Sequence, residues 1–191
     1  MRLRISSGVL GGRFLQVAKS DTDFRPTLDR TRQSVTNRLR SRIAGAIVGD
    51  FCAGSGALGF EMVSNGALQV HFVESHRGRA EAIRDCCRTF GVVDRCTVIG
   101  TDIRTYLQSC TVRYDIVYYD PPYDDPALSS LTPRLIEVLG PAGVLVVERR
   151  RPAQDDGQTP NPAPDDVRDF GDTRLEFHER PVDGSSVESA G

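Results

Sequence analysis

Residues 50–59 read DFCAGSGALG, and this stretch decides the fold. It follows the apolar run AIVG at 46–49 and precedes FEMVSNG at 60–66, so we expect a buried strand, a tight turn and a helix in succession. Gly54, Gly56 and Gly59 have the spacing G-x-G-x-x-G, which lets the backbone turn sharply and approach a ligand. Glu74 ends the next apolar run, where a carboxylate can accept hydrogen bonds from both hydroxyls of a ribose. The stretch therefore predicts a site for a cofactor that contains adenosine.

The same alternation of strand and helix continues to residue 150. Strand-like runs occupy 46–54, 68–75, 96–102, 114–120 and 142–150, and helical patterns occupy 55–66, 77–91, 103–110 and 127–140. Such alternation predicts a parallel sheet with crossover helices in one doubly wound α/β domain. Residues 167–180 predict a hairpin that closes the sheet edge, which gives a mostly parallel sheet of seven strands.

The segment before this sheet predicts a small hairpin and a helix. Short strands surround a glycine turn at 6–17, and a helix begins after Pro26. Its apolar residues Val35, Leu39 and Ile43 share one face, and we place Arg32, Arg38 and Arg42 on others. We divide the chain into a basic arm over 1–43, an α/β domain over 44–180 and a disordered tail over 181–191. The prolines at 152–164 predict a mobile loop.

The formal net charge of −2 conceals an uneven distribution. Residues 1–42 hold nine Arg and one Lys against three Asp, a charge of +7, so the other residues together carry −9. A basic arm ahead of an acidic body predicts an anionic partner that meets the N-terminal part of the chain.

The cysteine and histidine patterns exclude two classes of site. The five cysteines are odd in number and form no C-x-x-C pair, and the three histidines are scattered, so we expect neither a disulfide framework nor a metal site. No signal-like segment opens the sequence and no run of 18 apolar residues occurs, so we expect no membrane span. These patterns predict a soluble, reduced, cytoplasmic protein.

The residues around the glycines leave two cofactors open, NAD and S-adenosylmethionine. Asp50 lies just before the glycines, where a carboxylate can meet the ammonium group that only S-adenosylmethionine carries. Asp102 follows the third strand and can accept from an adenine amino group, with Ile103 against the ring. Asp102 is also suited to cap the helix that begins there, and one residue can do both.

A second motif follows the fourth strand, where residues 120–123 read DPPY. In open α/β sheets ligands bind beyond the carboxyl ends of the strands, so this motif and the glycine turn should face one crevice. Asp120 can accept a hydrogen bond from one hydrogen of a base amino group. The carbonyl of Pro121 or Pro122 can accept from the other hydrogen, and Tyr123 can stack on the base. The motif therefore predicts methylation of an exocyclic amino group. We expect it to act mostly by positioning that group for the transfer.

These motifs together resemble the RsmD family of bacterial 16S rRNA (guanine-N2) methyltransferases. The resemblance rests on RISSGVLGGRFLQV at 4–17, RPTLDRTRQSVTNRL at 25–39, DFCAGSGALGFEMVSNGA at 50–67 and DPPY at 120–123, in this order. It implies a class I methyltransferase fold with an N-terminal hairpin. It also implies that a monomer transfers methyl from S-adenosylmethionine to guanine N2 in the small subunit or its assembly intermediate.

The resemblance also assigns residues to the two halves of the site. Asp120, Pro121, Pro122 and Tyr123 are the catalytic motif. Arg25 and Thr27 border the site, and Arg30 and Arg32 face RNA. The cofactor-binding residues are Asp50, Phe51, Gly54, Gly56, Glu74, Asp102 and Ile103.

The sequence departs from the family at Gln33 and Thr36, where the family has a glutamate and an aromatic residue, and in the longer insert at 152–164. Alternative functions are DNA or protein-glutamine amino-methylation at the same site, RNA binding without catalysis, and NAD-dependent oxidation. A DNA enzyme generally needs a target-recognition region, and no segment here is long enough for one. The glycines and Asp120 are intact, which argues against an RNA-binding protein without catalysis. An NAD-dependent oxidoreductase would have no use for the DPPY motif.

Overall fold

The computed structural model describes residues 3–16, 29–122, 125–151 and 162–181. A seven-stranded sheet forms its centre, in the order β5-β4-β3-β6-β7-β9-β8. The strands from β3 to β7 pair in parallel, and β9 pairs antiparallel with both β7 and β8. The bounds are β3 Ile47–Phe51, β4 Gln69–Val73, β5 Cys96–Ile99, β6 Tyr114–Tyr119, β7 Leu139–Arg150, β8 Asp166–Phe170 and β9 Thr173–Glu179. This is the predicted fold class, closing hairpin included.

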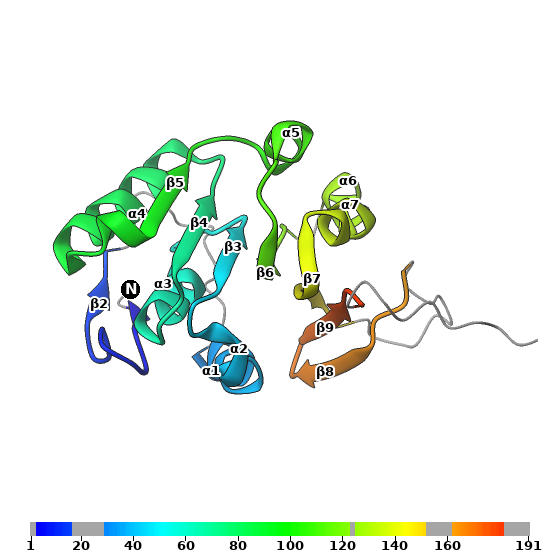
Figure 1. Cartoon of the computed structure of the whole chain (residues 1–191), viewed down its shortest axis with the longest axis horizontal. Coiled ribbons are helices and arrows are strands. Elements are labelled where there is room, and N and C mark those ends of the chain that lie inside the picture. Colours follow the sequence, from blue (N-terminus) through cyan, green and yellow to red (C-terminus); the bar gives the residue numbers. More distant parts are fainter. Residues whose placement is uncertain (1–2, 17–28, 123–124, 152–161, 182–191) are drawn as a thin grey trace, which may run out of the picture.

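Helices cover both faces of the sheet (Figure 1), and each face has its own hydrophobic cluster. Alternate strand residues enter the two clusters: Val48 and Ile116 enter the first, and Phe51 and Val117 the second. Helices α1 to α4 contribute to the first cluster and α5 to α7 to the second. The bounds are α1 Asp29–Arg38, α2 Arg40–Ile43, α3 Ala57–Ser64, α4 Arg77–Phe90, α5 Ile103–Ser109, α6 Pro126–Ser129 and α7 Thr132–Glu137, with a 3-10 turn η1 at Val93–Arg95.

The N-terminal hairpin packs on α3. Its strands β1, Leu3–Arg4, and β2, Phe14–Leu15, pair antiparallel, and Ile5 is buried in the first cluster. The buried carboxylate of Glu61 in α3 accepts hydrogen bonds from the backbone N–H and the hydroxyl of Ser6, both at 2.6 Å. The hairpin therefore shares its core with the sheet, while the domain boundary at residues 43 and 44 stays a prediction.

Helices α1 and α2 pack their apolar face on the sheet, and their arginines bind the closing hairpin. Val35, Leu39 and Ile43 are buried, as the helical spacing predicts. Arg38 pairs with Asp166 at 3.1 Å and Arg42 with Glu179 at 3.0 Å. Part of the basic charge of the arm is therefore balanced by the acidic body of the same chain.

One predicted helix is broken into two. The pattern over 127–140 predicts a continuous helix, but α6 ends at Ser129, α7 covers Thr132–Glu137, and β7 begins at Leu139. Pro133 lies at the start of α7. A proline has no N–H to donate, and its ring clashes with the carbonyl four residues before it, here that of Ser129, so the helix must restart at Pro133.

The predicted loop over 152–164 and the predicted tail over 181–191 fall mostly outside the described residues. The five cysteines are free. No helix in the described part of the chain has the length and apolar composition needed to cross a membrane. Over the same residues, no group of three or more His, Cys, Asp or Glu side chains is placed to hold a metal ion.

Candidate functional site

The carboxyl ends of four parallel strands carry the candidate site. Strand β3 lies between β4 and β6 with Phe51 opposite Val73 on one side and Tyr119 on the other. Residues that follow these strands therefore share one edge of the sheet. The predicted cofactor residues and the DPPY motif are brought to this edge together, as the strand order requires.

The glycine turn after β3 is built by backbone conformations that favour glycine. Gly54 and Gly56 have positive φ values of 57° and 71°. Gly59 has no room for a side chain, because a Cβ there would lie 2.2 Å from the Phe72 ring and 2.8 Å from Asp50 Oδ2. The first two glycines thus form the turn, and the third lets α3 pack closely on β3 and β4.

Glu74, directly after β4, is bonded to this turn. Its Oε2 accepts from the Gly54 N–H at 2.7 Å, and its Oε1 accepts from the His76 N–H at 2.7 Å. Its side chain is 4% exposed, so the carboxylate is held in one position. Each carboxylate oxygen has a second lone pair, so both can still accept from ribose hydroxyls. The positive-φ turn and this oriented acceptor fit an adenosine cofactor.

Asp50 is buried at the base of the turn. Its Oδ2 accepts from the Gly59 N–H at 2.9 Å, which satisfies one of the free donors in the first turn of α3. Burial raises the pKa of Asp50 to about 7, the Gly59 hydrogen bond partly offsets this, and the charge of Glu74 adds to it. A buried carboxyl of this kind is poised to become charged beside a cation.

Cys52 shows that the predicted carboxylates converge. It directly follows β3 and has a positive φ of 59°, which is uncommon for a non-glycine residue. Burial raises the pKa of its thiol far above the ordinary value. Four nearby carboxylates raise it further, and they are Glu74, Asp120, Asp102 and Asp50. The four acids that the motifs indicate are therefore all near Cys52.

Asp102 caps α5, as one of its two predicted roles requires. It accepts from the Arg104 N–H at 2.9 Å, and its ion pair with the Arg104 side chain holds the pKa of Asp102 below its usual value. Its predicted contact with adenine stays a prediction. Ile103 is 3% exposed in the second cluster, and Phe51 is fully buried against the rings of Tyr106 and Tyr114. Any contact of Phe51 with a cofactor therefore involves its backbone.

The DPPY motif begins directly after β6. The Asp120 N–H donates to the Phe51 carbonyl at 3.3 Å, which keeps the start of the motif next to the end of β3. Asp120 is half-buried, Pro121 is buried and Pro122 is exposed. Tyr123 lies outside the described residues, so its stacking role stays a prediction.

The predicted RNA-contacting residues have different outcomes. Arg25 and Thr27 lie outside the described residues. Arg30 is exposed. Arg32 is 1% exposed and donates to the Arg4 carbonyl at 3.2 Å, so the expectation that it faces RNA is wrong. Arg32 precedes Val35 by one helical turn and shares its buried face, a spacing that could have revealed this placement.

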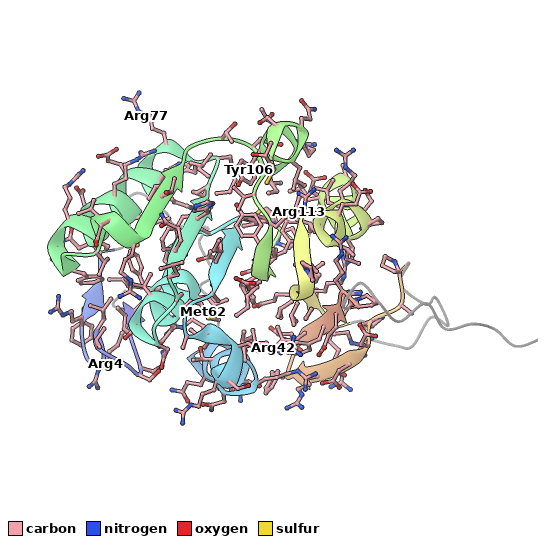
Figure 2. The ribbon with its side chains drawn as sticks, in the orientation of Figure 1. Arg4, Arg42, Met62, Arg77, Tyr106 and Arg113 are labelled. Carbon is pink, nitrogen blue, oxygen red and sulfur yellow. The ribbon has the colours of Figure 1, made fainter. Side chains whose placement is uncertain are left out.

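Exposed arginines also lie outside the N-terminal arm. Figure 2 places Arg4 and Arg42 on the side of the hairpin and of α1 and α2, with Arg77 and Arg113 on other parts of the surface. Arg42 is already paired with Glu179. Of the described arginines predicted to meet RNA, Arg30 is the one at the surface.

Sequence reasoning missed one acid at this edge, Glu148 in β7. It is 3% exposed and accepts from the Tyr118 hydroxyl through Oε2. The signal was present, because Glu148 closes the apolar run VLVV as Glu74 and Asp120 close theirs.

Comparison with known proteins places the chain among methyltransferases. The family model described as conserved hypothetical protein 95 matches residues 3–179. A Bacillus subtilis protein named "Putative rRNA methyltransferase YlbH" is 28% identical over 92% of this chain and 94% of its own length. The Haemophilus influenzae protein named "Ribosomal RNA small subunit methyltransferase D" is 32% identical over 63% of this chain, and the match covers 64% of that protein.

Solved structures share the fold. One is titled "Putative methyltransferase yhhF from Escherichia coli" and has a TM-score of 0.77 at 24% identity, covering 95% of this chain and 99% of that one. An RNA methyltransferase from Salinibacter ruber, solved with S-adenosyl-L-homocysteine, has a TM-score of 0.63 at 17% identity and covers 82% of this chain and 94% of that one. At these identities the likeness concerns the fold.

Proposed function

The chain belongs to the conserved hypothetical protein 95 family, of the RsmD type, and from this premise we propose that it methylates the exocyclic N2 amino group of a guanine in 16S rRNA. Methylation of rRNA is the activity that its relatives' names indicate, and structural neighbours solved with S-adenosyl-L-homocysteine support S-adenosylmethionine as the cofactor. The choice of guanine N2 is the finer part of the proposal. The observation that carries the proposal of methyl transfer is the hydrogen bond from the Asp120 N–H to the Phe51 carbonyl, which puts the DPPY motif beside the glycine turn that Glu74 holds.

The three acids of the cofactor side have separate parts. Glu74 holds the ribose with oxygens already oriented by the Gly54 and His76 N–H groups. Asp50, whose pKa is about 7, becomes a carboxylate when an ammonium group lies beside it. Asp102, at the start of α5, faces the adenine end of the site.

Asp120 performs the positioning. S-adenosylmethionine held by these residues would supply a methyl group on a positively charged sulfur, which would keep the electron pair of the broken carbon–sulfur bond when nitrogen takes the methyl group. Asp120 accepts one amino hydrogen and thereby aims the nitrogen lone pair at the methyl carbon. The carbonyl of Pro121 accepts the other hydrogen. The amino group releases its proton after transfer, so Asp120 need not be a strong base.

The RNA half of the proposal rests on the arm. Arg30 is exposed on α1 and contributes to phosphate binding, while the assignment of Arg25 and Thr27 to the border of the site concerns residues outside the described ones. The substrate is the small subunit or its assembly intermediate, and the enzyme acts as a monomer.

The test is to incubate the protein with methyl-labelled S-adenosylmethionine and small subunits from a strain that lacks this gene. We expect label in 16S rRNA, recovered as N2-methylguanosine after digestion to nucleosides and located at one nucleotide by mass spectrometry. Subunits from the parent strain are the control, because their site is already methylated. Label on DNA adenine or on protein glutamine, with none on rRNA guanine, overturns the proposal.

A further inference from the structure

Glu148 lies beside Asp120 at the carboxyl edge of the sheet. Strands β6 and β7 are parallel and pair Tyr118 with Val146 and Tyr119 with Val147. The next residues along the two strands are Asp120 and Glu148. Glu148 lies within β7, which continues to Arg150, and Asp120 directly follows the last residue of β6 with its N–H still donating to the Phe51 carbonyl of β3.

The two acids also point to the same face. Ile116 and Tyr118 of β6 enter the first cluster, as do Val144 and Val146 of β7. Because strand side chains alternate, Glu148 in β7 projects on that side, and the same alternation extended by one residue beyond β6 puts Asp120 there. Neighbouring strands lie about 5 Å apart, so both carboxylates can reach one edge of a single base.

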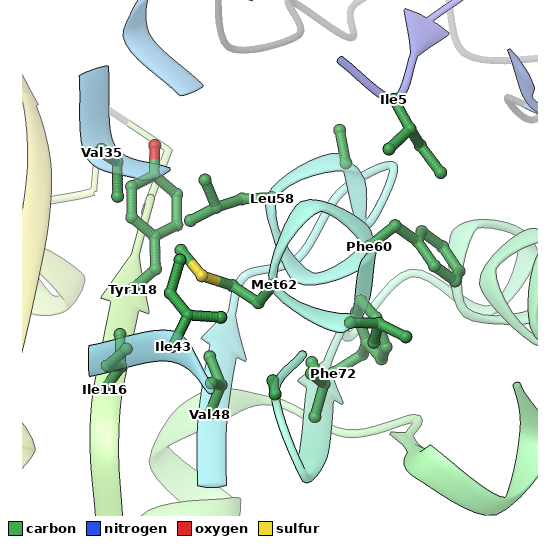
Figure 3. Packing of buried hydrophobic residues seen from close by; sticks show 14 of the residues in the cluster. Ile5, Val35, Ile43, Val48, Leu58, Phe60, Met62, Phe72, Ile116 and Tyr118 are labelled. Carbon is green, nitrogen blue, oxygen red and sulfur yellow. The ribbon is translucent and has the colours of Figure 1, made fainter. Parts of the chain in front are cut away.

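Tyr118 holds the Glu148 carboxylate at this position. Its hydroxyl donates to Glu148 Oε2, and both side chains are buried. Figure 3 shows the Tyr118 hydroxyl pointing away from Ile116 and toward Val35 of α1. Since Ile116 precedes Tyr118 in β6, which ends at Tyr119, this direction is toward the carboxyl end of the strand, which Asp120 directly follows.

Two adjacent acceptors match the hydrogen-bonding edge of guanine. Guanine presents two donors side by side, the ring N1–H and the N2 amino group. Adenine and cytosine have an amino group beside a bare ring nitrogen, which is an acceptor. A carboxylate facing that nitrogen meets a lone pair instead of a hydrogen, and both groups are left without a partner.

We propose that Glu148 accepts a hydrogen bond from guanine N1–H while Asp120 holds the amino group, so that Glu148 selects guanine among the bases that carry an amino group. Tyr118 acts through Glu148 as a positioning residue. This inference rests on the proposed function and adds to it the residue that reads the base.

The test uses 2-aminopurine, which carries the 2-amino group but has a bare ring N1. Small subunits are reconstituted with 16S rRNA that holds guanosine or 2-aminopurine riboside at the methylated position, and kcat/KM is measured on each. We expect the wild-type protein to prefer guanosine by about 100-fold or more. Glu148→Gln should reduce this preference at least about tenfold, because a carboxamide can donate to the bare N1. Tyr118→Phe should reduce the preference less, since the carboxylate remains but loses its orienting donor.

Glu176→Gln is the matched control. Glu176 is 2% exposed on β9 and binds Arg149 at 2.7 Å, on the face opposite Glu148. It should keep the wild-type preference. If Glu148→Gln keeps the wild-type preference for guanosine over 2-aminopurine riboside, at any melting temperature, the inference is overturned. The proposed function is not affected by that result. A wild-type protein that leaves guanosine unmethylated overturns both.

Discussion

Glu74 Oε2 accepts a hydrogen bond from the Gly54 N–H at 2.7 Å, which joins the end of β4 to the glycine turn that follows β3. The other oxygen of the same carboxylate accepts from the His76 N–H. A single side chain thus shapes the turn and presents its remaining lone pairs to a ligand. Loss of Glu74 should therefore affect both stability and cofactor binding.

Glu74→Ala should weaken binding of S-adenosylhomocysteine by about 100-fold and lower the free energy of unfolding by about 2 kcal/mol, because two backbone donors lose a charged acceptor. Calorimetric titration and urea unfolding measure the two effects. Glu61→Ala is the control: Glu61 is equally buried and accepts from the Ser6 N–H, but it lies under the hairpin. It should cost similar stability and leave affinity within about threefold. Unchanged affinity in Glu74→Ala would contradict the ribose-binding role.

The pKa of Asp50 predicts a pH dependence of cofactor binding. Burial raises this pKa to about 7, and the ammonium group of the cofactor favours the ionised carboxyl. Affinity for S-adenosylhomocysteine should therefore rise as the pH rises through 7, by about tenfold between pH 6 and pH 8. Asp50→Asn should bind more weakly and show a flat profile over this window. An equally steep profile in Asp50→Asn would assign the titration to another group.

Stability should depend on Asp50 with the opposite sign. Its pKa is higher in the folded state than the ordinary value of 3.8, so ionisation opposes folding as the pH rises from about 4 to about 7. Without cofactor, Asp50→Asn should gain stability relative to the wild-type protein across this range. Urea unfolding at several pH values measures the difference.

The positions of the strands and of their terminal acids could be predicted from the sequence. Alternation of apolar runs with helical patterns fixes the strand ends, and the switch point then brings Asp50, Glu74 and Asp120 to one edge. The hydrogen-bond partner of each of these carboxylates could not be predicted from the sequence. The bond between Asp50 and the Gly59 N–H depends on how closely α3 approaches β3, which is a property of the packed structure.

The errors had physical causes that are visible in the sequence. The family resemblance assigns Arg32 to RNA, but Arg32 is one helical turn from Val35, and this position puts its side chain on the buried face of α1. Pro133 interrupts a helix that apolar spacing alone makes continuous. Glu148 belongs neither to the glycine turn nor to the DPPY motif, so the motifs alone do not indicate it.

Gly59→Ala should destabilise the protein by about 2 kcal/mol, because the added methyl would lie 2.2 Å from the Phe72 ring and 2.8 Å from Asp50 Oδ2. It should also weaken S-adenosylhomocysteine binding, since Asp50 must shift. Gly91→Ala is the control: Gly91 ends α4 with a φ of 69° and has open space around it. It should cost about 1 kcal/mol of backbone strain and leave binding unchanged. Equal binding by both variants would show that Gly59 matters only for packing.

Arg30→Glu should weaken binding to 16S rRNA and lower the salt dependence of binding, because it removes a phosphate contact and adds a repulsive charge. The slope of log K against log salt should fall by about 1. Arg134→Glu is the control, since Arg134 lies in α7 on the other face of the sheet and is 56% exposed. Filter binding at several salt concentrations gives both slopes. Equal slopes for the wild-type protein and Arg30→Glu would refute a phosphate contact.

Asp120 should control the rate of methyl transfer and leave cofactor binding nearly unchanged. Its N–H is fixed to the Phe51 carbonyl at 3.3 Å, so the backbone stays in place when the side chain is changed. Asp120→Ala should lower the single-turnover rate on small subunits by about 10³-fold, because the amino group loses its acceptor, with S-adenosylhomocysteine affinity within about threefold. Asp120→Asn keeps an oxygen that can accept, so its rate should fall between those of the wild-type protein and Asp120→Ala. A large loss of S-adenosylhomocysteine affinity in both variants would instead place Asp120 on the cofactor side of the site.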